Sequence, residues 1–182
     1  MDFTDLNKVF PKDSYPLPRI DQLVDSTAGH RLLNFMDAFS GYNQIKMDKE
    51  DQEKTSSITS QGLFCYKMMP FGLKNAGATY QRLVNHMFRP QIGRNVEVYV
   101  DDMLVKSLDE ERHLDDLQET FNTFRRHQMK LNPNKCAFGV SSGKFLGFMV
   151  SQRGIEANPD KIQAILDIEP PKNIKEVQSL TG

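Results

Sequence analysis

Two adjacent carboxylates, Asp101 and Asp102, stand at the end of an alternating run of apolar and polar side chains. The alternation over residues 96–100 has the period of a half-buried strand, with the valines on one face and Glu97 and Tyr99 on the other. Two acids at a strand end repel each other and lose solvation unless a cation offsets their charge. The pair is therefore a candidate metal site, with a plain solvated turn as the simpler alternative.

A third carboxylate, Asp37, ends the mainly apolar stretch 31–37, where a second strand is expected. It precedes Asp101 by 64 positions (37 to 101), so only the fold can bring the two together. Oxygen ligands with open coordination positions suit Mg²⁺ and two-metal phosphoryl chemistry. Because neighbours in an extended chain point to opposite faces, Asp37 and Asp101 are the expected direct ligands, with Asp102 behind them or bound transiently. Unrelated acids that cap helices or face water are the alternative.

The elements that must position these acids follow from periodicity and turn residues. Residues 2–29 are predicted to be polar, turn-rich and extended. Strands are predicted at 31–37, 55–59, 63–69, 136–140 and 144–150, with a hairpin that pairs 96–100 with 103–106. Helices are predicted at about 75–89, from a capping box at 107–110 to before Asn132, and from 158 to about 167. This order predicts an α+β fold of the split βαβ, ferredoxin-like type: an antiparallel sheet with helices on one face.

The predicted helices carry apolar stripes that should form the core. These stripes are Tyr80, Leu83, Val84, Met87 and Phe88 on the first helix, and Leu114, Leu117, Phe121 and Phe124 on the second.

Three motifs in sequence order resemble the first three palm motifs of reverse transcriptases. They are FMDAFSGYNQI (35–45), MPFGLKNA (69–76) and YVDD (99–102). The segments KDSYPLPRIDQL (12–23) and KFLGF (144–148) narrow the resemblance to the polymerase of gypsy-type LTR retrotransposons, and the chain looks most like those of plant elements. The resemblance runs from Asp2 to Gly182.

The resemblance implies a polymerase palm with partial fingers. Residues 1–30 and 43–75 would be partial fingers, 31–42 and 76–150 palm, and 151–182 the start of the connection toward a thumb. The implied activity is RNA-directed DNA synthesis, in which nucleotides pass from a dNTP to a primer 3′-hydroxyl with two Mg²⁺ ions, or Mn²⁺ as a substitute. The implied partners are an RNA or DNA template with its primer, dNTPs, and the neighbouring thumb and RNase H domains of a polyprotein.

The resemblance also implies residue roles. The catalytic set would be Asp37, Asp101, Asp102 and Lys135, with the three acids as metal ligands and Lys135 as a proton donor to pyrophosphate. The nucleotide would contact Ala38, Phe39, Tyr42, Phe71 and Gly72, and Tyr42 would exclude a ribose 2′-hydroxyl. The primer would contact Tyr99, Phe145, Leu146 and Gly147. The alternatives are a packed aromatic at Tyr42, a solvated lysine at Lys135 and a plain core strand at 145–147.

Composition limits the partners. The chain has 182 residues and a formal net charge of −1, so it carries no general basic field for nucleic acid, and binding would have to be local. Cys65 and Cys136 are isolated, which predicts a reduced, intracellular protein, in a cytoplasmic particle or the nucleus. No apolar run is long enough to span a bilayer, so no membrane partner is expected.

Two departures from complete enzymes lower the expected activity. In complete enzymes, the basic fingers residues that hold the triphosphate lie upstream of the segment that matches residues 2–7 of this sequence. The thumb and RNase H segments of those enzymes also have no match in it. We therefore expect feeble incorporation by this chain alone. The second function class is a non-catalytic retrotransposon remnant that binds nucleic acid or another protein. An RNA-recognition module is disfavoured because no strand has the aromatic signature used for base stacking.

Overall fold

The structure, a computed structural model, describes residues 2–168, 170 and 173–181. Its centre is a four-stranded antiparallel sheet in the order β4-β5-β1-β6. These strands are β1 (Leu32–Asp37), β4 (Val96–Tyr99), β5 (Asp102–Ser107) and β6 (Ala137–Val140). The predicted α+β class is confirmed by this antiparallel sheet and the helices around it. Within the sheet, the strand ending in Asp37 pairs directly with the second strand of the hairpin.

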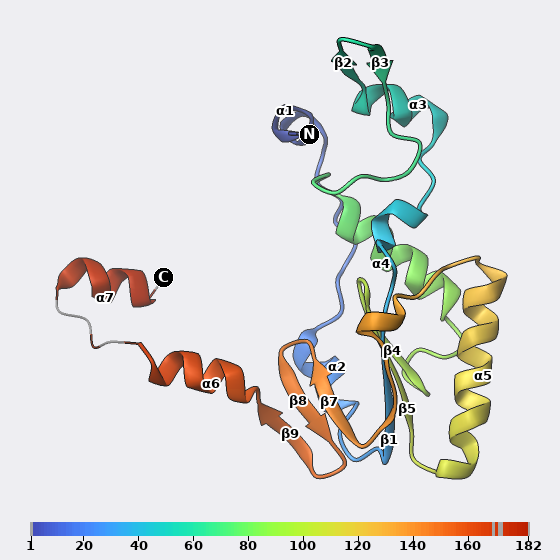
Figure 1. Ribbon diagram of the computed structural model, residues 1–182, viewed down its shortest axis with the longest axis vertical. Coiled ribbons are helices and arrows are strands. Elements are labelled where there is room, and N and C mark those ends of the chain that lie inside the picture. Colours follow the sequence, from blue (N-terminus) through green and yellow to red (C-terminus); the bar gives the residue numbers. More distant parts are fainter. Residues whose placement is uncertain (1, 169, 171–172, 182) are drawn as a thin grey trace.

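Two long helices, α4 (Ala76–Met87) and α5 (Glu110–Arg126), lie against one face of this sheet (Figure 1). The predicted stripe of the first helix is confirmed in the core, with Leu83 partly buried at its edge. Each large apolar side chain removed from water stabilises the fold by roughly 1.5–3 kcal/mol. The cluster is made by Met36, Ala38, Tyr80, Val84, Met87, Phe88, Val96, Val98, Met103, Val105, Phe124 and Met129.

The opposite face packs on helix α2 (Ile20–Asp25) and a small antiparallel sheet of β7 (Ser142–Phe145), β8 (Phe148–Ser151) and β9 (Gly154–Ala157). Strand β7 crosses close to β1 at Gly143. A Cβ there would lie 2.2 Å from the Phe35 ring, so only glycine permits this approach. The second cluster consists of Leu23, Val24, Leu33, Leu104, Phe145 and Val150.

Most of the remaining elements lie away from the central sheet (Figure 1). Toward one end are α1 (Thr4–Val9), η1 (Gly41–Gln44), α3 (Lys49–Gln52), η2 (Glu53–Thr55) and the hairpin of β2 (Ser57–Thr59) and β3 (Gly62–Phe64). The short helix η3 (Pro133–Lys135) precedes β6, and α6 (Pro159–Leu166) and α7 (Ile174–Thr181) follow β9. Across the described residues, no helix is both long and apolar enough to cross a membrane.

Several sequence predictions about elements differ from the structure. Residues 2–29 are not simply extended, because they contain α1 and α2, and α2 is held by burial of Leu23 and Val24 rather than by a side-chain cap. Residues 144–150 form no single strand, because Leu146 (φ 50°) and Gly147 (φ 88°) turn the chain between β7 and β8. Strand β9 was not predicted. The strands predicted at 55–59 and 63–69 are only three residues long each.

The predicted stripe of helix α5 is confirmed at Phe124, which is buried, and at Leu117 and Phe121, which are partly buried against the first cluster, but not at Leu114. Leu114 is 72% exposed, and the buried positions are His113, Thr120, Thr123 and Phe124. The helix turns this polar row inward because the buried amide of Gln91 bonds both Thr120 and Thr123. The predicted capping box does not form, since Ser107 belongs to β5 and its hydroxyl donates to Asp116.

Strand β4 is buried on both faces, which the half-buried pattern did not predict. Glu97 is 3% exposed and pairs with Lys106, whose Nζ lies 2.8 Å from Glu97 Oε1 and 2.7 Å from Ser26 O. The apolar stem of Lys106 and its two acceptors compensate the cost of burying a charge. This ion pair ties the end of α2 to the hairpin that carries the paired acids.

We predict that removing one partner of this pair is far more damaging than removing both. Glu97→Leu leaves the Lys106 ammonium buried without a carboxylate and should cost about 3–5 kcal/mol of unfolding free energy. Glu97→Leu combined with Lys106→Met should recover most of that loss, because two apolar side chains replace two buried charges. Urea unfolding of the variants measures this, and a double variant as unstable as the single one contradicts the explanation.

We also predict that His113 makes the fold sensitive to mild acid. Burial lowers the pKa of His113 below its usual 6.5, with Asp116 opposing the shift. The unfolded chain therefore takes up this proton first as the pH falls, so the stability is complete above about pH 6.5 and declines as the pH drops through the lowered folded pKa. Melting temperatures between about pH 7 and 5 should fall less steeply in His113→Asn than in the parent chain. The exposed His86 on α4 offers the matched control, and an unchanged slope in His113→Asn contradicts the assignment.

Candidate active site

The antiparallel register of β1 on β5 sets Asp37 directly opposite Asp102. Side chains of directly opposed residues project from the same face, with Cβ atoms typically about 5 Å apart. The burial pattern agrees with this. Leu33 and Phe35 lie on the same face of β1 as Asp37, Leu104 lies on the same face of β5 as Asp102, and these three apolar residues meet in the second cluster. The carboxylates far apart in sequence are thus brought together at one end of the sheet.

The tight turn between β4 and β5 holds Val100 and Asp101. Val100 has a φ of 53°, a left-handed conformation that a β-branched residue rarely adopts and that costs of order 1–3 kcal/mol. Because Asp101 lies in this turn, strict strand alternation does not govern its direction. Asp102, expected behind the other two acids, is instead the one that faces Asp37 in the register.

The three carboxylates act on one another and on the rings beneath them. Partial burial, then the charges of Asp101 and Asp37, raise the pKa of Asp102, while Lys135 opposes the shift. Burial and the Asp101 carboxylate raise the pKa of Tyr42, and the same causes with Asp37 raise the pKa of Tyr80 strongly. The end of β1 and the β4–β5 turn therefore concentrate negative charge, which the Lys135 ammonium offsets only in part.

This donor set fits a hard divalent cation that completes its shell elsewhere. Among the described residues, no three His, Cys, Asp or Glu side chains stand close enough to form a protein-only metal cage. Mg²⁺ usually keeps waters and substrate phosphates and takes only one or two carboxylates from the protein. Asp37 and Asp102 across the strands, with Asp101 in the adjoining turn, match that open type of site.

Lys135 lies beside the first acid. Its Nζ is 3.4 Å from Asp37 Oδ2, and its side chain is 64% exposed, whereas that of Asp37 is only 18% exposed. Helix η3 brings it there, and the backbone N–H of Asn132 anchors the preceding loop by donating to Asp37 O. An exposed ion pair of this kind is weak, so the ammonium is free to move between Asp37 and a nearby anion.

An aromatic cluster adjoins the acids. The Tyr42 ring stands edge-on to Phe71 (5.1 Å between centroids) and to Tyr80 (5.5 Å). Gly41 makes room for it, because a Cβ at this position would lie 2.8 Å from Tyr80 Oη. Gly72 turns the chain with a φ of 95°, and its carbonyl accepts from Asn7 Nδ2. Phe39 and Phe71 are 54% and 60% exposed, leaving an open aromatic surface beside a fixed tyrosine.

The candidate primer-contacting residues divide into two groups. Tyr99 pairs directly with Asp102 at the end of β4 and is half-buried. Phe145 is 3% exposed within the second cluster, so its side chain is a core residue. Leu146 and Gly147 make the turn between β7 and β8, where both are half-buried and the Lys161 side chain lies close to Gly147.

Two glutamines near the acids were missed by the sequence analysis. Gln81 is fully buried and reaches the β4–β5 turn from α4. Gln44 bonds Phe39 O and both backbone groups of Lys130, bracing the loop after Asp37. Gln81 could have been found from the sequence, because it is a polar residue within the apolar face of the predicted helix 75–89. No feature of the sequence distinguished Gln44.

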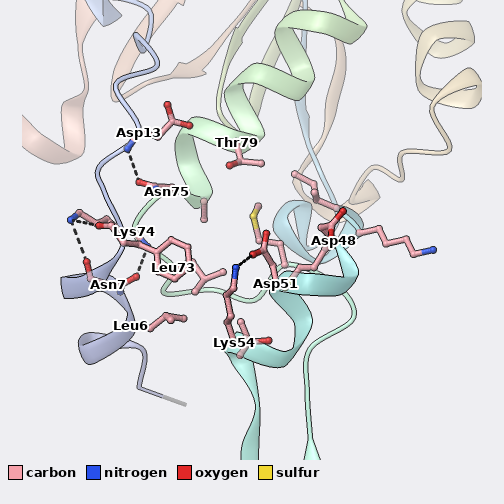
Figure 2. Close-up of a pocket in the computed structure, with 17 residues that line it drawn as sticks. Leu6, Asn7, Asp13, Asp48, Asp51, Lys54, Leu73, Lys74, Asn75 and Thr79 are labelled. Carbon is pink, nitrogen blue, oxygen red and sulfur yellow. Dashed lines mark hydrogen bonds and ion pairs between the residues drawn. The ribbon is translucent and has the colours of Figure 1, made fainter.

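A separate cavity of about 320 Å³ lies among α1, the α3–η2 segment and the turn before α4 (Figure 2). Its lining is mostly apolar, with the Asp51–Lys54 ion pair on one side. Asn7 closes the opposite side, donating to Gly72 O and accepting from Lys74 N. None of the three acids lines this cavity, so it is not the site of the proposed chemistry.

Comparison with known proteins agrees with these motifs. Residues 1–150 match the family model for reverse transcriptase (RNA-dependent DNA polymerase). The Pol polyproteins of the Drosophila melanogaster transposons 297 and gypsy are 35% and 32% identical over all 182 residues, and the Tf2-3 polyprotein of Schizosaccharomyces pombe is 30% identical. The chain spans 17%, 18% and 14% of their respective lengths. The gypsy-type resemblance is confirmed, and the likeness to plant elements stays a prediction.

Solved structures show the same fold. A foamy viral protease-reverse transcriptase in complex with an RNA/DNA hybrid superposes with a TM-score of 0.85 at 22% identity, covering 100% of this chain and 24% of that chain. The same type of enzyme with double-stranded DNA gives a TM-score of 0.88 at 22% identity, covering 100% and 38%. With a matching family model over residues 1–150 and the predicted motifs in place, the chain belongs to the reverse transcriptase family.

Proposed function

We propose that this chain forms the polymerase palm and partial fingers of a retrotransposon Pol protein and carries out RNA-directed DNA synthesis. The observation that supports this best is the register that sets Asp37 against Asp102, with Asp101 in the adjoining turn. Family membership gives this arrangement its chemistry, because template-directed polymerisation needs acidic oxygens at one point of a rigid sheet.

Asp37, Asp101 and Asp102 are the proposed holders of two Mg²⁺ ions, which Mn²⁺ would replace. When bound, the ions lower the pKa of the primer 3′-hydroxyl and neutralise the triphosphate. The protein supplies a fixed edge, since Asp37 ends a strand paired on both sides. Partial burial and, after it, the charges of Asp101 and Asp37 raise the pKa of Asp102, and a bound cation would relieve the charge part of this cost.

Tyr42 is the proposed selector of the sugar. Its ring stands edge-on to Phe71 and Tyr80, and these contacts oppose its movement away from a 2′-hydroxyl. Ala38, Phe39, Phe71 and Gly72 would border the nucleotide, with the two exposed rings available to the base and sugar. Tyr42 packs against the first cluster beside Tyr80, and Asp37 lies in the chain between Met36 and Ala38 of that cluster.

The proposed nucleic-acid partner is a template with its primer. The foamy viral neighbours were solved with an RNA/DNA hybrid and with double-stranded DNA, and this chain shares their fold. The backbone at 146–147 and the half-buried Tyr99 are the proposed primer contacts. Thumb and RNase H domains of a Pol polyprotein, dNTPs and an intracellular setting belong to the same proposal, as does the division into fingers (1–30, 43–75), palm (31–42, 76–150) and a connection (151–182).

We predict that each acid matters for cation binding as well as for synthesis. Asp37→Asn or Asp101→Asn should weaken Mn²⁺ binding, followed by electron paramagnetic resonance, by more than the about 10–100-fold that loss of a supporting group costs. Template-dependent dNTP incorporation on a primed RNA, weak in the parent chain, should disappear. Asp115, exposed on α5, provides the control, because Asp115→Asn leaves the site charge unchanged. Unaltered Mn²⁺ affinity in Asp37→Asn contradicts the proposal, and binding without any incorporation favours a non-catalytic module.

Lys135 should have opposite effects on the two measurements. Lys135→Met removes a cation 3.4 Å from Asp37, so Mn²⁺ should bind up to about fivefold more tightly, the range for an exposed ion pair. If Lys135 also donates a proton to pyrophosphate, the same variant should incorporate dNTPs more slowly. Lys49→Met, exposed on α3, is the matched control. No change in either quantity would make Lys135 an ordinary solvated lysine.

A further inference from the structure

Gln81 is a fully buried amide on α4, inside a helix face that is otherwise apolar. Burying an amide without partners is costly, so its contacts reveal what the fold gains from it. All of them are to the hairpin that carries the paired acids or to one neighbouring side chain.

The side chain of Gln81 holds the β4–β5 turn from beneath. The backbone N–H of Val100 donates to Gln81 Oε1 at 2.7 Å, and Gln81 Nε2 donates to Val98 O at 3.3 Å. Val100 has the left-handed φ of 53°, which valine disfavours. Its N–H lies outside the strand ladder of β4 with β5 and finds its acceptor in Gln81.

A second amide sets the direction of the first. Gln81 Nε2 also donates to Asn85 Oδ1 at 2.9 Å, and Asn85 Nδ2 donates to Tyr15 Oη at 2.8 Å. An amide offers an acceptor at one end and donors at the other, so Asn85 leaves Gln81 Oε1 as the end that faces Val100. Tyr15 is fixed in turn by the Arg82 guanidinium, 4.6 Å from its ring centroid. A line of hydrogen bonds thus runs from the N-terminal segment to the turn.

We propose that Gln81 is a positioning residue for the acids: it stabilises Val100 in its left-handed conformation and so sets where Asp101 lies relative to Asp37. The inference rests on the proposed function for its catalytic meaning. The competing explanation is that Gln81 is a core amide with all its hydrogen bonds made, so that replacing it lowers the stability of the fold and has no effect on the position of the acids. The chain contains a matched case, since Gln91 is equally buried and doubly bonded but contacts Thr120 and Thr123 instead of the turn.

The test compares Gln81→Met with Gln91→Met in the whole chain. Amide hydrogen exchange at Val100, read by NMR, and Mn²⁺ affinity are measured alongside melting temperature. Both variants should lose melting temperature. Only Gln81→Met should expose the Val100 amide and weaken Mn²⁺ binding, by about 10-fold or more, the range for loss of a group that orients a metal ligand. Equal effects of the two variants, or none at Val100, overturn the inference.

A rescue variant separates positioning from general stability. Glycine adopts positive φ without strain, so Val100→Gly placed on Gln81→Met should restore at least half of the lost Mn²⁺ affinity on a logarithmic scale. An affinity no better than that of Gln81→Met overturns the inference.

If Gln81→Met does not fold, Asn85→Ala replaces it: faster exchange at Val100 supports the inference, and unchanged exchange overturns it. If the parent chain binds no Mn²⁺, the proposed function fails, and exchange at Val100 alone decides the role of Gln81.

Discussion

The register of β1 against β5 is the constraint on which the rest of this structure depends. It places Asp37 across from Asp102 and leaves Asp101 in the turn beside them, so negative charge gathers at the end of a sheet that is covered on both faces. Such crowding is unfavourable, because burial first and then the two neighbouring carboxylates raise the pKa of Asp102. A one-residue slip in register would separate the acids onto different faces, which explains why the sheet is fixed by two independent clusters and a buried ion pair.

Helix α4 links this constraint to both sides of the site. Tyr80 supports the loop that follows Asp37, and Gln81, the next residue, supports the turn that carries Asp101. The aromatic face of Tyr42 rests on the same helix. The two acidic segments, more than sixty positions apart in sequence, therefore share one rigid foundation. A site built on packed elements keeps its geometry better than one built on loops.

Periodicity and motifs were enough to predict the strands that bear Asp37 and the paired acids, helix α4 with its apolar face, and the family. Prediction failed where tertiary contacts overrule local pattern. Glu97 looked solvent-facing, but Lys106 from the paired strand buries it. Leu114 fitted an apolar stripe, yet it is exposed, while two threonines of the same helix are buried with Gln91 as their partner. The place of Asp101, in a turn shaped by the left-handed Val100, is something that no spacing rule predicts.

Anomalous X-ray scattering from crystals soaked with Mn²⁺ and a nonhydrolysable dNTP analogue would test the central claim most directly. The account predicts two manganese peaks about 4 Å apart at the end of β1 and the β4–β5 turn, with oxygens of Asp37 and of the paired acids as ligands. Manganese bound only at other acidic positions, with the three carboxylates left to water, would contradict it.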